Sequence, residues 1–250
     1  MTSIEVQAIS YNEEAMLPYW IRHFSTFASK LVLHDSGSTD RTVEIAKAAG
    51  VEIRPWSMDN KVNDRLMAEK KAEGWKGTTA DWVIVGDIDE FLYFPLGVEA
   101  SFRIYDRDRL PFVRAVGWEM VSDVFPTTTG QIYDEVKYGA PSERWYSKTQ
   151  ILNPHLIKTI SFEMGAHSCR ANLKSGHLVH SPAVPSNPPV YLLHAKHLGS
   201  VEEIGAKYDA YRARFSELNI KNNWGCHTDG RKHAQEKRSQ IMAHCQRVIV

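Results

Sequence analysis

The chain contains no apolar run long enough to cross a membrane, since a spanning helix needs about 20 apolar residues. Its first residues, MTSIEVQAISYNEE, lack the basic and apolar stretches of a secretory signal. Excess charge of either sign is also missing, because 30 basic residues balance 30 acidic ones. We therefore expect no transmembrane segment and no basic field that attracts nucleic acid, and leave peripheral association with a membrane open.

Cysteine is scarce in this sequence. Cys169, Cys226 and Cys245 form no CxxC pair, and their odd number argues against a disulfide framework. A reducing, cytoplasmic compartment is the location that we expect. Because 43% of the 250 residues are hydrophobic, the chain can still bury one large core, which fits a single α/β domain with additions.

Short apolar runs alternate with helical patterns over the first 95 residues. The patterns predict strands at residues 4–9, 30–34, 51–54 and 82–85, and helices at residues 13–27, 41–49 and 63–74. Strands spaced by helices indicate βαβ units and a parallel sheet, whose ligands bind beyond the carboxyl ends of the strands. Polar segments follow three of these strands, at residues 11–14, 35–40 and 87–90. We expect the functional site at this edge.

The second half of the chain has a different pattern. It predicts strands and hairpins and then two helices, at residues 112–122, 156–180, 200–218 and from about 230 to the end. A turn is expected at residues 174–176, and the proline-rich segment 181–189 excludes regular helix and central strand. Ser200 and Glu203 form a capping box at the start of the first helix. Without a repeat or a long linker, residues 1–250 are expected to form one domain.

The segment ADWVIVGDIDEFLYF places Asp87, Asp89 and Glu90 at the end of a buried strand. In extended backbone, Asp87 and Asp89 would point to the same side and could converge on one cation. Mg²⁺ and Mn²⁺ prefer oxygen ligands, often carboxylates together with substrate phosphates. Such an ion would bridge a diphosphate and neutralise charge on a leaving group. The alternative is a strand end closed by solvated acids.

Three motifs, in this order, resemble the GT-A glycosyltransferases, in particular their family 2-like group. They are SYNEE at residues 10–14, DSGSTDRT at residues 35–42 and DID at residues 87–89. The second is similar to the family pattern D-x-x-S-x-D-x-T, and Trp20 matches a tryptophan in the helix after the N-E motif of one branch. The resemblance covers about the first 95 residues. It implies a GT-A fold, with a mostly parallel sheet flanked by helices and with C-terminal hairpins and helices.

The resemblance also implies a division of the chain into two halves. Residues 1–95 would bind a nucleotide-diphosphate sugar, with UDP as the favoured nucleotide, and residues 96–250 would bind a carbohydrate or other hydroxyl acceptor. Asp35 matches the family acid at the base or ribose, and Asn12 lies near the nucleoside. Arg65 or Asn63 would contact the donor.

Bland alternatives stand beside these assignments. Asn12 could equally cap the first helix. Residues 35–40 could equally form a turn and a cap, and the capping role is the one that we give to Asp40.

A Mn²⁺ or Mg²⁺ ion is the cofactor that the resemblance implies. Asp89 would be its principal ligand, while Asp87, with Ile88 beside it, would line the donor and take part in metal binding and catalysis. The segment LLHAKH, at residues 192–197, resembles an arrangement of many GT-A enzymes. In those enzymes a late histidine before a C-terminal helix is a further metal ligand.

Two histidines compete for this third position. We choose His194, with His197 as the alternative, and expect Lys196 at the diphosphate. For either histidine the alternative is a purely structural role, as a side chain at a strand end that is hydrogen-bonded to the backbone.

A second cluster of possible ligands consists of His167, Cys169, His177 and His180, because imidazole and thiolate suit zinc. Their spacing matches no standard zinc finger, and the residues between them are predicted to form a hairpin. We favour a role for His167 in the acceptor cleft.

An inverting transferase needs a general base within hydrogen-bond distance of the acceptor hydroxyl. Glu119 and Asp123 flank a predicted acceptor loop and are the candidates, while Trp118 could stack on a sugar or pack in the core. The sequence does not indicate which of these two acids is the base. It also does not distinguish an inverting from a retaining mechanism. A nucleotidyltransferase and an inactive sugar-binding protein are the alternative functions, although SYNEE differs from the glycine-rich, basic phosphate loop of the former.

Overall fold

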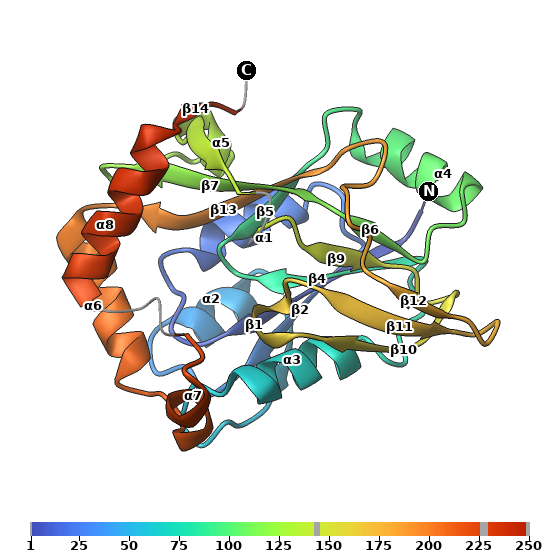
Figure 1. Ribbon diagram of the computed structural model, residues 1–250, viewed down its shortest axis with the longest axis horizontal. Helices are drawn as coiled ribbons and strands as arrows, with labels where there is room; N and C mark the ends of the chain where they lie inside the picture. The colour runs from blue at the N-terminus through green and yellow to red at the C-terminus, as the bar shows by residue number, and fades with distance from the viewer. Residues whose placement is uncertain (1, 143–145, 226–229, 249–250) are drawn as a thin grey trace.

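The structure is a computed structural model that describes residues 2–142, 146–225 and 230–248. Cys226 and the last two residues of the predicted C-terminal helix lie outside this part of the chain. Two large β-sheets, a smaller third sheet and surrounding helices make up the molecule (Figure 1). No helix within the described ranges is both long and apolar enough to cross a membrane.

The first large sheet contains the predicted parallel strands, in the order β3-β2-β1-β4-β9-β6. The strands are β1 (Ile4–Ser10), β2 (Lys30–Asp35), β3 (Glu52–Pro55), β4 (Trp82–Asp87), β6 (Phe112–Arg114) and β9 (Thr149–Leu152). Parallel pairing joins β3, β2, β1 and β4, and antiparallel pairing adds β9 and β6. All seven residues of β1 are buried, because both faces of a parallel sheet are covered.

Three helices connect the parallel strands. They are α1 (Leu17–Phe24), α2 (Thr42–Ala48) and α3 (Asp64–Glu73). The first begins four residues later than predicted, because the backbone N–H groups of Glu13 and Glu14 donate to Thr42 and Asp40 in the next loop. The predicted end of α2 at Gly50 is confirmed, since this glycine has a φ of +73°.

The second large sheet has the strand order β14-β8-β7-β13-β5. Its strands are β5 (Glu90–Tyr93), β7 (Val116–Ser122), β8 (Tyr138–Pro141), β13 (Tyr191–Leu198) and β14 (Gln246–Arg247). Only a turn at residues 88–89 separates β4 of the first sheet from β5 of the second. The predicted acidic segment is therefore the junction between the two sheets.

The remaining helices are α4 (Val98–Arg107), α5 (Ile132–Glu135), α6 (Val201–Arg212), α7 (Glu217–Asn222) and α8 (Gly230–Ala243). The predicted capping box is confirmed, because Ser200 and Glu203 bond each other's backbone N–H groups. α6 ends at Arg212 instead of residue 218, since residues 214–216 bond to the backbone of Val62. α6 and α8 pack together along one side of the molecule (Figure 1).

The third sheet is small and covers α3. It contains β10 (Ile157–Phe162), β11 (Cys169–Leu173) and β12 (Leu178–His180), with the short 3-10 helix η1 (Met164–Ala166) between the first two. The predicted hairpin turn is confirmed, since Gly176 has a φ of +92° and its N–H donates to Leu173.

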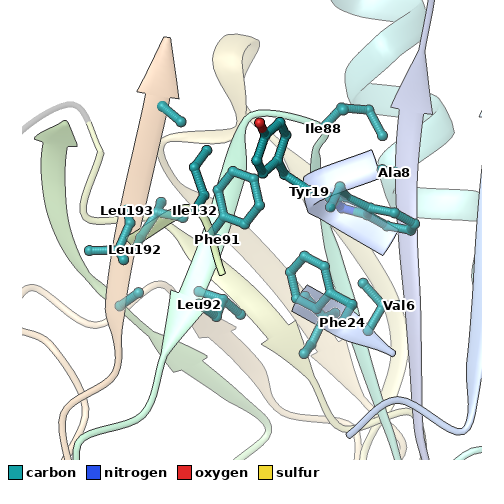
Figure 2. Packing of buried hydrophobic residues seen from close by; sticks show 14 of the residues in the cluster. Val6, Ala8, Tyr19, Phe24, Ile88, Phe91, Leu92, Ile132, Leu192 and Leu193 are labelled. Atoms are coloured by element: carbon teal, nitrogen blue, oxygen red, sulfur yellow. The ribbon is translucent and has the colours of Figure 1, made fainter. Parts of the chain in front are cut away.

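The main core includes α1 and inward-facing residues of both large sheets. Figure 2 shows Phe91 of β5 and Leu193 of β13 on one side, with Tyr19 and Phe24 of α1 on the other. A second apolar cluster joins α3 to the first and third sheets. The expected fold class is confirmed: the chain is mixed α/β, with a mostly parallel sheet flanked by helices and with hairpins and helices in its C-terminal half.

A histidine lies inside the main core. His23 is only 3% exposed, and its Nε2–H donates to the carbonyl of Leu92 at 3.0 Å. The other ring nitrogen, Nδ1, is buried without a partner. Burial lowers the pKa of His23 from 6.5 to about 4, because it penalises the charged ring by more than hydrogen bonding to Leu92 and Gln131 favours it.

We predict that His23 destabilises the protein in mild acid. The unfolded chain takes up a proton near pH 6.5 that the folded chain refuses until about pH 4, so stability falls across this window. At pH 5 the contribution is on the order of 2 kcal/mol. His23→Gln should shrink the loss of unfolding free energy between pH 7.5 and pH 5, measured by urea titration. His155→Gln, at an exposed position, should lose as much unfolding free energy over this pH range as the wild type. Equal losses in the wild type, His23→Gln and His155→Gln would contradict the prediction.

Candidate functional site

The three predicted polar segments lie at one edge of the first large sheet. Ser10 pairs with Asp35 in the register of β1 and β2, and Ile9 pairs with Asp87 in that of β1 and β4. The second sheet reaches the same edge, because the backbone N–H of Ala195 in β13 donates to the carbonyl of Asp89 at 2.7 Å. Residues from both halves of the chain therefore build the candidate site.

Side chains bind the first two loops to each other. Asn12 has a φ of +55°, and its side-chain oxygen accepts the N–H of Thr39 at 2.7 Å. The N–H of Asn12 donates to the hydroxyl of Ser38 at 2.9 Å. The alternative that Asn12 caps the first helix is wrong, because Met16 occupies the N-cap position of α1. A nucleoside contact by Asn12 stays a prediction.

Asp35 and Asp40 shape the second loop. Asp35 is buried, and its carboxylate accepts the N–H groups of Gly37 and Ser38 and the hydroxyl of Ser38. Asp40 accepts the N–H of Thr42 at 2.9 Å at the start of α2, which confirms its capping role. A carboxylate has about four acceptor positions. Asp35 can therefore form this turn and still accept a hydrogen bond from a nucleoside.

The acidic motif after β4 is bent. The strand ends at Asp87, residues 88–89 form a turn, and Glu90 begins β5. The extended backbone assumed for this motif is therefore wrong. The side chain of Ile88 is 2% exposed and belongs to the main core, so that only its backbone can reach a donor.

Two buried lysines neutralise the carboxylates beside this turn. The Nζ atom of Lys71 lies 2.7 Å from Asp87, and that of Lys148 lies 2.6 Å from Glu90 and 3.9 Å from Asp87. Glu90 also accepts the amide of Gln150 and the N–H of Asp87. Burial alone would raise the pKa of Glu90, but Lys148 and Lys71 outweigh it and lower the pKa to about 2. Glu90 in turn raises the pKa of Lys148, so this buried pair is charged at neutral pH.

Asp89 faces a histidine from the other sheet. Its Oδ2 atom lies 3.5 Å from Nε2 of His194, whose ring stacks on Tyr146 with 4.0 Å between centroids. Burial would raise the pKa of Asp89, but the neighbouring His194, Lys196 and Lys148 hold it well below the ordinary value. The predicted approach of Asp89 and His194, 105 positions apart in the chain, is thus present in the structure.

A β-bulge in β13 accompanies this approach. His194 pairs with Glu119 and His197 pairs with Val121, so β13 spends one residue more than β7 over the same distance. His194 therefore lies inside a strand, which corrects the expectation that it follows one. Bulges change the direction of side chains and are frequent beside active sites. Here the bulged segment includes Ala195, whose N–H binds the carbonyl of Asp89.

Lys196 and His197 occupy different environments on this bulge. Lys196 is half-buried, lies 5.0 Å from the ring centroid of Tyr208 and forms no ion pair with the described carboxylates. Burial lowers its pKa, and Asp89 partly opposes this effect. His197 is buried, and burial lowers its pKa well below 6.5. Among the described residues, Lys196 thus forms no ion pair, and its charge is available to a ligand.

The two candidate bases differ in burial. Glu119 is 3% exposed, its Oε2 atom lies 3.1 Å from the ammonium of Lys237 in α8, and its Oε1 atom is buried without a partner. The side chain of Asp123 is 90% exposed and pairs with Arg238. The structure therefore brings Glu119, and not Asp123, beside His194.

Asn63 and Arg65, at the start of α3, make contacts within their own helix. Asn63 caps the helix by accepting the N–H of Leu66 at 3.2 Å, and Arg65 forms an exposed ion pair with Glu69 at 3.0 Å. The residue between them, Asp64, has its pKa raised by burial and lies within the field of Asp87. A donor contact by Arg65 or Asn63 stays a prediction.

The zinc hypothesis is wrong. In the part of the chain that the structure describes, no three His, Cys, Asp or Glu side chains lie close enough to hold a metal ion. Cys169 is buried and accepts the hydroxyl of Ser181, while His177 bonds to Ser175 in an exposed turn. Of the predicted Mn²⁺ or Mg²⁺ ligands, Asp89 and His194 approach each other, while Lys71 lies 2.7 Å from Oδ2 of Asp87. Metal binding by Asp87 stays a prediction.

Several residues of this site are not predicted from the sequence. Lys71 shares a helix face with the buried Ala68 and Ala72, and this periodicity could have marked it as inward-facing. Lys148 and Tyr146 belong to an irregular segment that offers no such signal. Glu13 was noticed only as part of a motif. Burial and the nearby Asp89 raise its pKa to about 8.

No protein-family model matches the chain, and neither does any curated protein. Among solved structures, it is similar to glucosyl-3-phosphoglycerate synthase from Mycobacterium tuberculosis in complex with Mn²⁺, UDP and glucosyl-3-phosphoglycerate. The identity is 24% over 36% of this chain and 34% of that chain, with a TM-score of 0.29. For the complex of that enzyme with Mn²⁺, UDP-glucose and phosphoglyceric acid, the identity is 20% over 47% of this chain and 44% of that chain, with a TM-score of 0.33.

S. aureus TarS is a further similar structure, with 14% identity over 61% of this chain and 28% of that chain and a TM-score of 0.34. In each comparison this chain spans less than half the length of the solved protein. Because these superpositions are partial, we base the function on the residues of this chain.

We predict that Lys148 stabilises the junction between the two large sheets. Lys148→Met would leave the carboxylate of Glu90 buried without its cation, which should lower the free energy of unfolding by about 3–5 kcal/mol. The double variant Lys148→Met, Glu90→Gln should recover part of this loss, because no charge stays buried. Lys158→Met, at an exposed position of β10, is the matched control. Equal unfolding free energies for Lys148→Met and Lys158→Met in urea titrations would contradict the prediction.

Proposed function

We propose that this protein is a divalent-metal-dependent glycosyltransferase of the GT-A type, formed by one domain over residues 1–250. It would move a sugar from a nucleotide-diphosphate donor, with UDP as the nucleotide, to a hydroxyl acceptor. The observation that supports the proposal best is the approach of Asp89 and His194 to 3.5 Å at the carboxyl edge of β4. Three lysines surround this point, at positions 71, 148 and 196.

The pair Asp89 and His194 fits a divalent cation. Mg²⁺ and transition-metal ions lie about 2.0–2.2 Å from oxygen and nitrogen ligands, so two ligand atoms 3.5 Å apart can reach one ion. Asp89 is ionised, and Nε2 of His194 points toward it. When bound, Mn²⁺ or Mg²⁺ would neutralise the negative charge that develops on the diphosphate leaving group. We assign Asp87, held by Lys71, to the sugar and ribose side of the donor.

The donor half supplies the remaining contacts in this proposal. Lys196 has a charge free for the diphosphate, because the described carboxylates form no ion pair with it. Asp35 and Asn12 line the nucleoside from two loops that bond to each other, which limits their motion before the donor binds. The loop after β1 contains two glutamates and no glycine, so it does not favour a nucleotidyltransferase.

Glu119 is the general base in our proposal. It lies opposite His194 in the register of β7 and β13, and its Oε1 atom is buried without a partner. A hydroxyl that donates to this oxygen would remove an unfavourable buried acceptor and would be placed for deprotonation. Lys237 binds the other oxygen, so the carboxylate has one atom for orientation and one for the acceptor.

We predict that Asp89→Asn removes most Mn²⁺-dependent affinity for UDP. The substitution takes away an ionised ligand, and the loss should be at least about tenfold, or about 1.4 kcal/mol. Uridine affinity should stay the same, because uridine has no phosphate for the ion to contact. Isothermal titration calorimetry with Mn²⁺ and UDP, with UDP alone and with uridine measures the three affinities.

The matched control is Asp108→Asn, which changes an exposed aspartate paired with Arg107. It should bind Mn²⁺ and UDP as the wild type does. Undiminished Mn²⁺-dependent UDP affinity in Asp89→Asn would sink the assignment of the metal centre.

A further inference from the structure

Arg114, the last residue of β6, is a cation that has no counter-ion within the described part of the chain. No carboxylate of the described residues pairs with its guanidinium, and its Nε atom is buried without a hydrogen-bond acceptor. Burial lowers the pKa of this half-buried side chain, and the described residues provide no carboxylate that opposes the effect. A buried donor without an acceptor is unfavourable, and an oxygen atom of a ligand would satisfy the Nε atom of Arg114.

The groups around Arg114 do not supply the missing negative charge. Cys169 lies close enough for the two side chains to affect each other's ionisation, but burial raises the pKa of its thiol, which stays neutral. The hydroxyl of Ser181 donates to the Cys169 sulfur at 3.2 Å and accepts from Thr149 at 3.2 Å. These neighbours satisfy each other and leave the guanidinium unmatched.

The backbone of Arg114 is held on both sides. Its N–H donates to the hydroxyl of Ser186, and its carbonyl accepts the N–H of Ser186, each at 3.0 Å. The next residue, Ala115, donates to the carbonyl of Lys148 at 2.9 Å. These bonds fix the backbone from which the side chain extends, so no backbone freedom is lost there when a ligand binds.

Arg114 adjoins the proposed catalytic edge on the side of the acceptor half. It pairs with Thr149, the neighbour of the lysine that lies 3.9 Å from Asp87. From its other side, Cys169 leads within two residues to His167, whose ring centroid lies 6.4 Å from that of Tyr146. Tyr146 in turn stacks on His194. Three contacts and two residues of chain thus connect Arg114 to the proposed metal ligand His194.

We propose that Arg114 forms an oxyanion subsite, which binds a carboxylate or phosphate group of an acidic acceptor. The planar fork of a guanidinium matches the oxygens of both groups and binds them through paired hydrogen bonds. The acceptor role depends on the proposed function, whereas oxyanion binding does not. The substrate class that follows is an acceptor with an acidic group beside its reacting hydroxyl.

Inorganic phosphate is the probe for this subsite. At a concentration tenfold above its dissociation constant, phosphate should raise the melting temperature of the wild type by roughly 3 °C relative to chloride of equal ionic strength. Arg114→Gln should lose this rise. Arg170→Gln, at an exposed position of β11, should retain it. Acetate should act in the same direction as phosphate, and neutral glycerol should not.

Two arms separate the acceptor side from the donor side. Lys196→Gln should retain the rise, because the phosphate does not occupy the place of the donor diphosphate. The rise should also persist in the presence of saturating Mg²⁺ and UDP. Loss of the rise in Lys196→Gln, or its suppression by UDP, would overturn the proposal by placing the phosphate in the donor site.

Other results bear on Arg114 directly. A rise that survives in Arg114→Gln, or no rise in the wild type, overturns the subsite. Arg114→Gln should keep the Mn²⁺-dependent affinity for UDP, which also shows that the variant is folded, and Arg114→Lys should recover part of the phosphate effect. If the wild type fails to bind UDP with Mn²⁺, the transferase proposal fails while the phosphate result still decides the oxyanion subsite.

Discussion

Glu90 is the first residue of β5, directly after the turn that joins the two large sheets. Its buried carboxylate binds both Lys148 and the backbone N–H of Asp87. The second contact closes the turn at residues 88–89, and the first ties this turn to the strand that follows Lys148. A buried carboxylate is stable only with such partners. The rest of the candidate site depends on this interaction, because it sets where Asp89 projects between the sheets.

Two irregularities, one from each half of the chain, meet at Asp89. The turn after β4 brings its carboxylate out of the sheet, and the bulge in β13 brings His194 toward it while Ala195 binds its backbone carbonyl. Around this point, the described residues leave Lys196 without an ion pair and one buried oxygen of Glu119 without a hydrogen bond. In the proposed transferase these two groups would face the donor and the acceptor, with Arg114 extending the acceptor side.

Local patterns in the sequence predicted what local forces determine. The parallel strands, the hairpins and the capping box of Ser200 were confirmed because apolar periodicity and capping are short-range properties. The errors have a common cause in contacts between distant residues. The first helix is shortened by bonds from Thr42 and Asp40, and the acidic motif is bent by Glu90 with Lys148. The approach of His194 to Asp89 was expected only from the family resemblance, and periodicity gave no sign of the bulge.

The release of UDP from a panel of UDP-sugars, with Mn²⁺ and with Mn²⁺ plus a chelator, tests the central claim most directly. Transfer of the sugar to water or to an acceptor liberates UDP from the donor, so the assay needs no knowledge of the acceptor. We predict that the wild-type protein releases UDP from at least one donor in the presence of Mn²⁺ and that chelation abolishes the release. Release that is indifferent to the chelator, or no release from any donor of the panel, would contradict a metal-dependent glycosyltransferase.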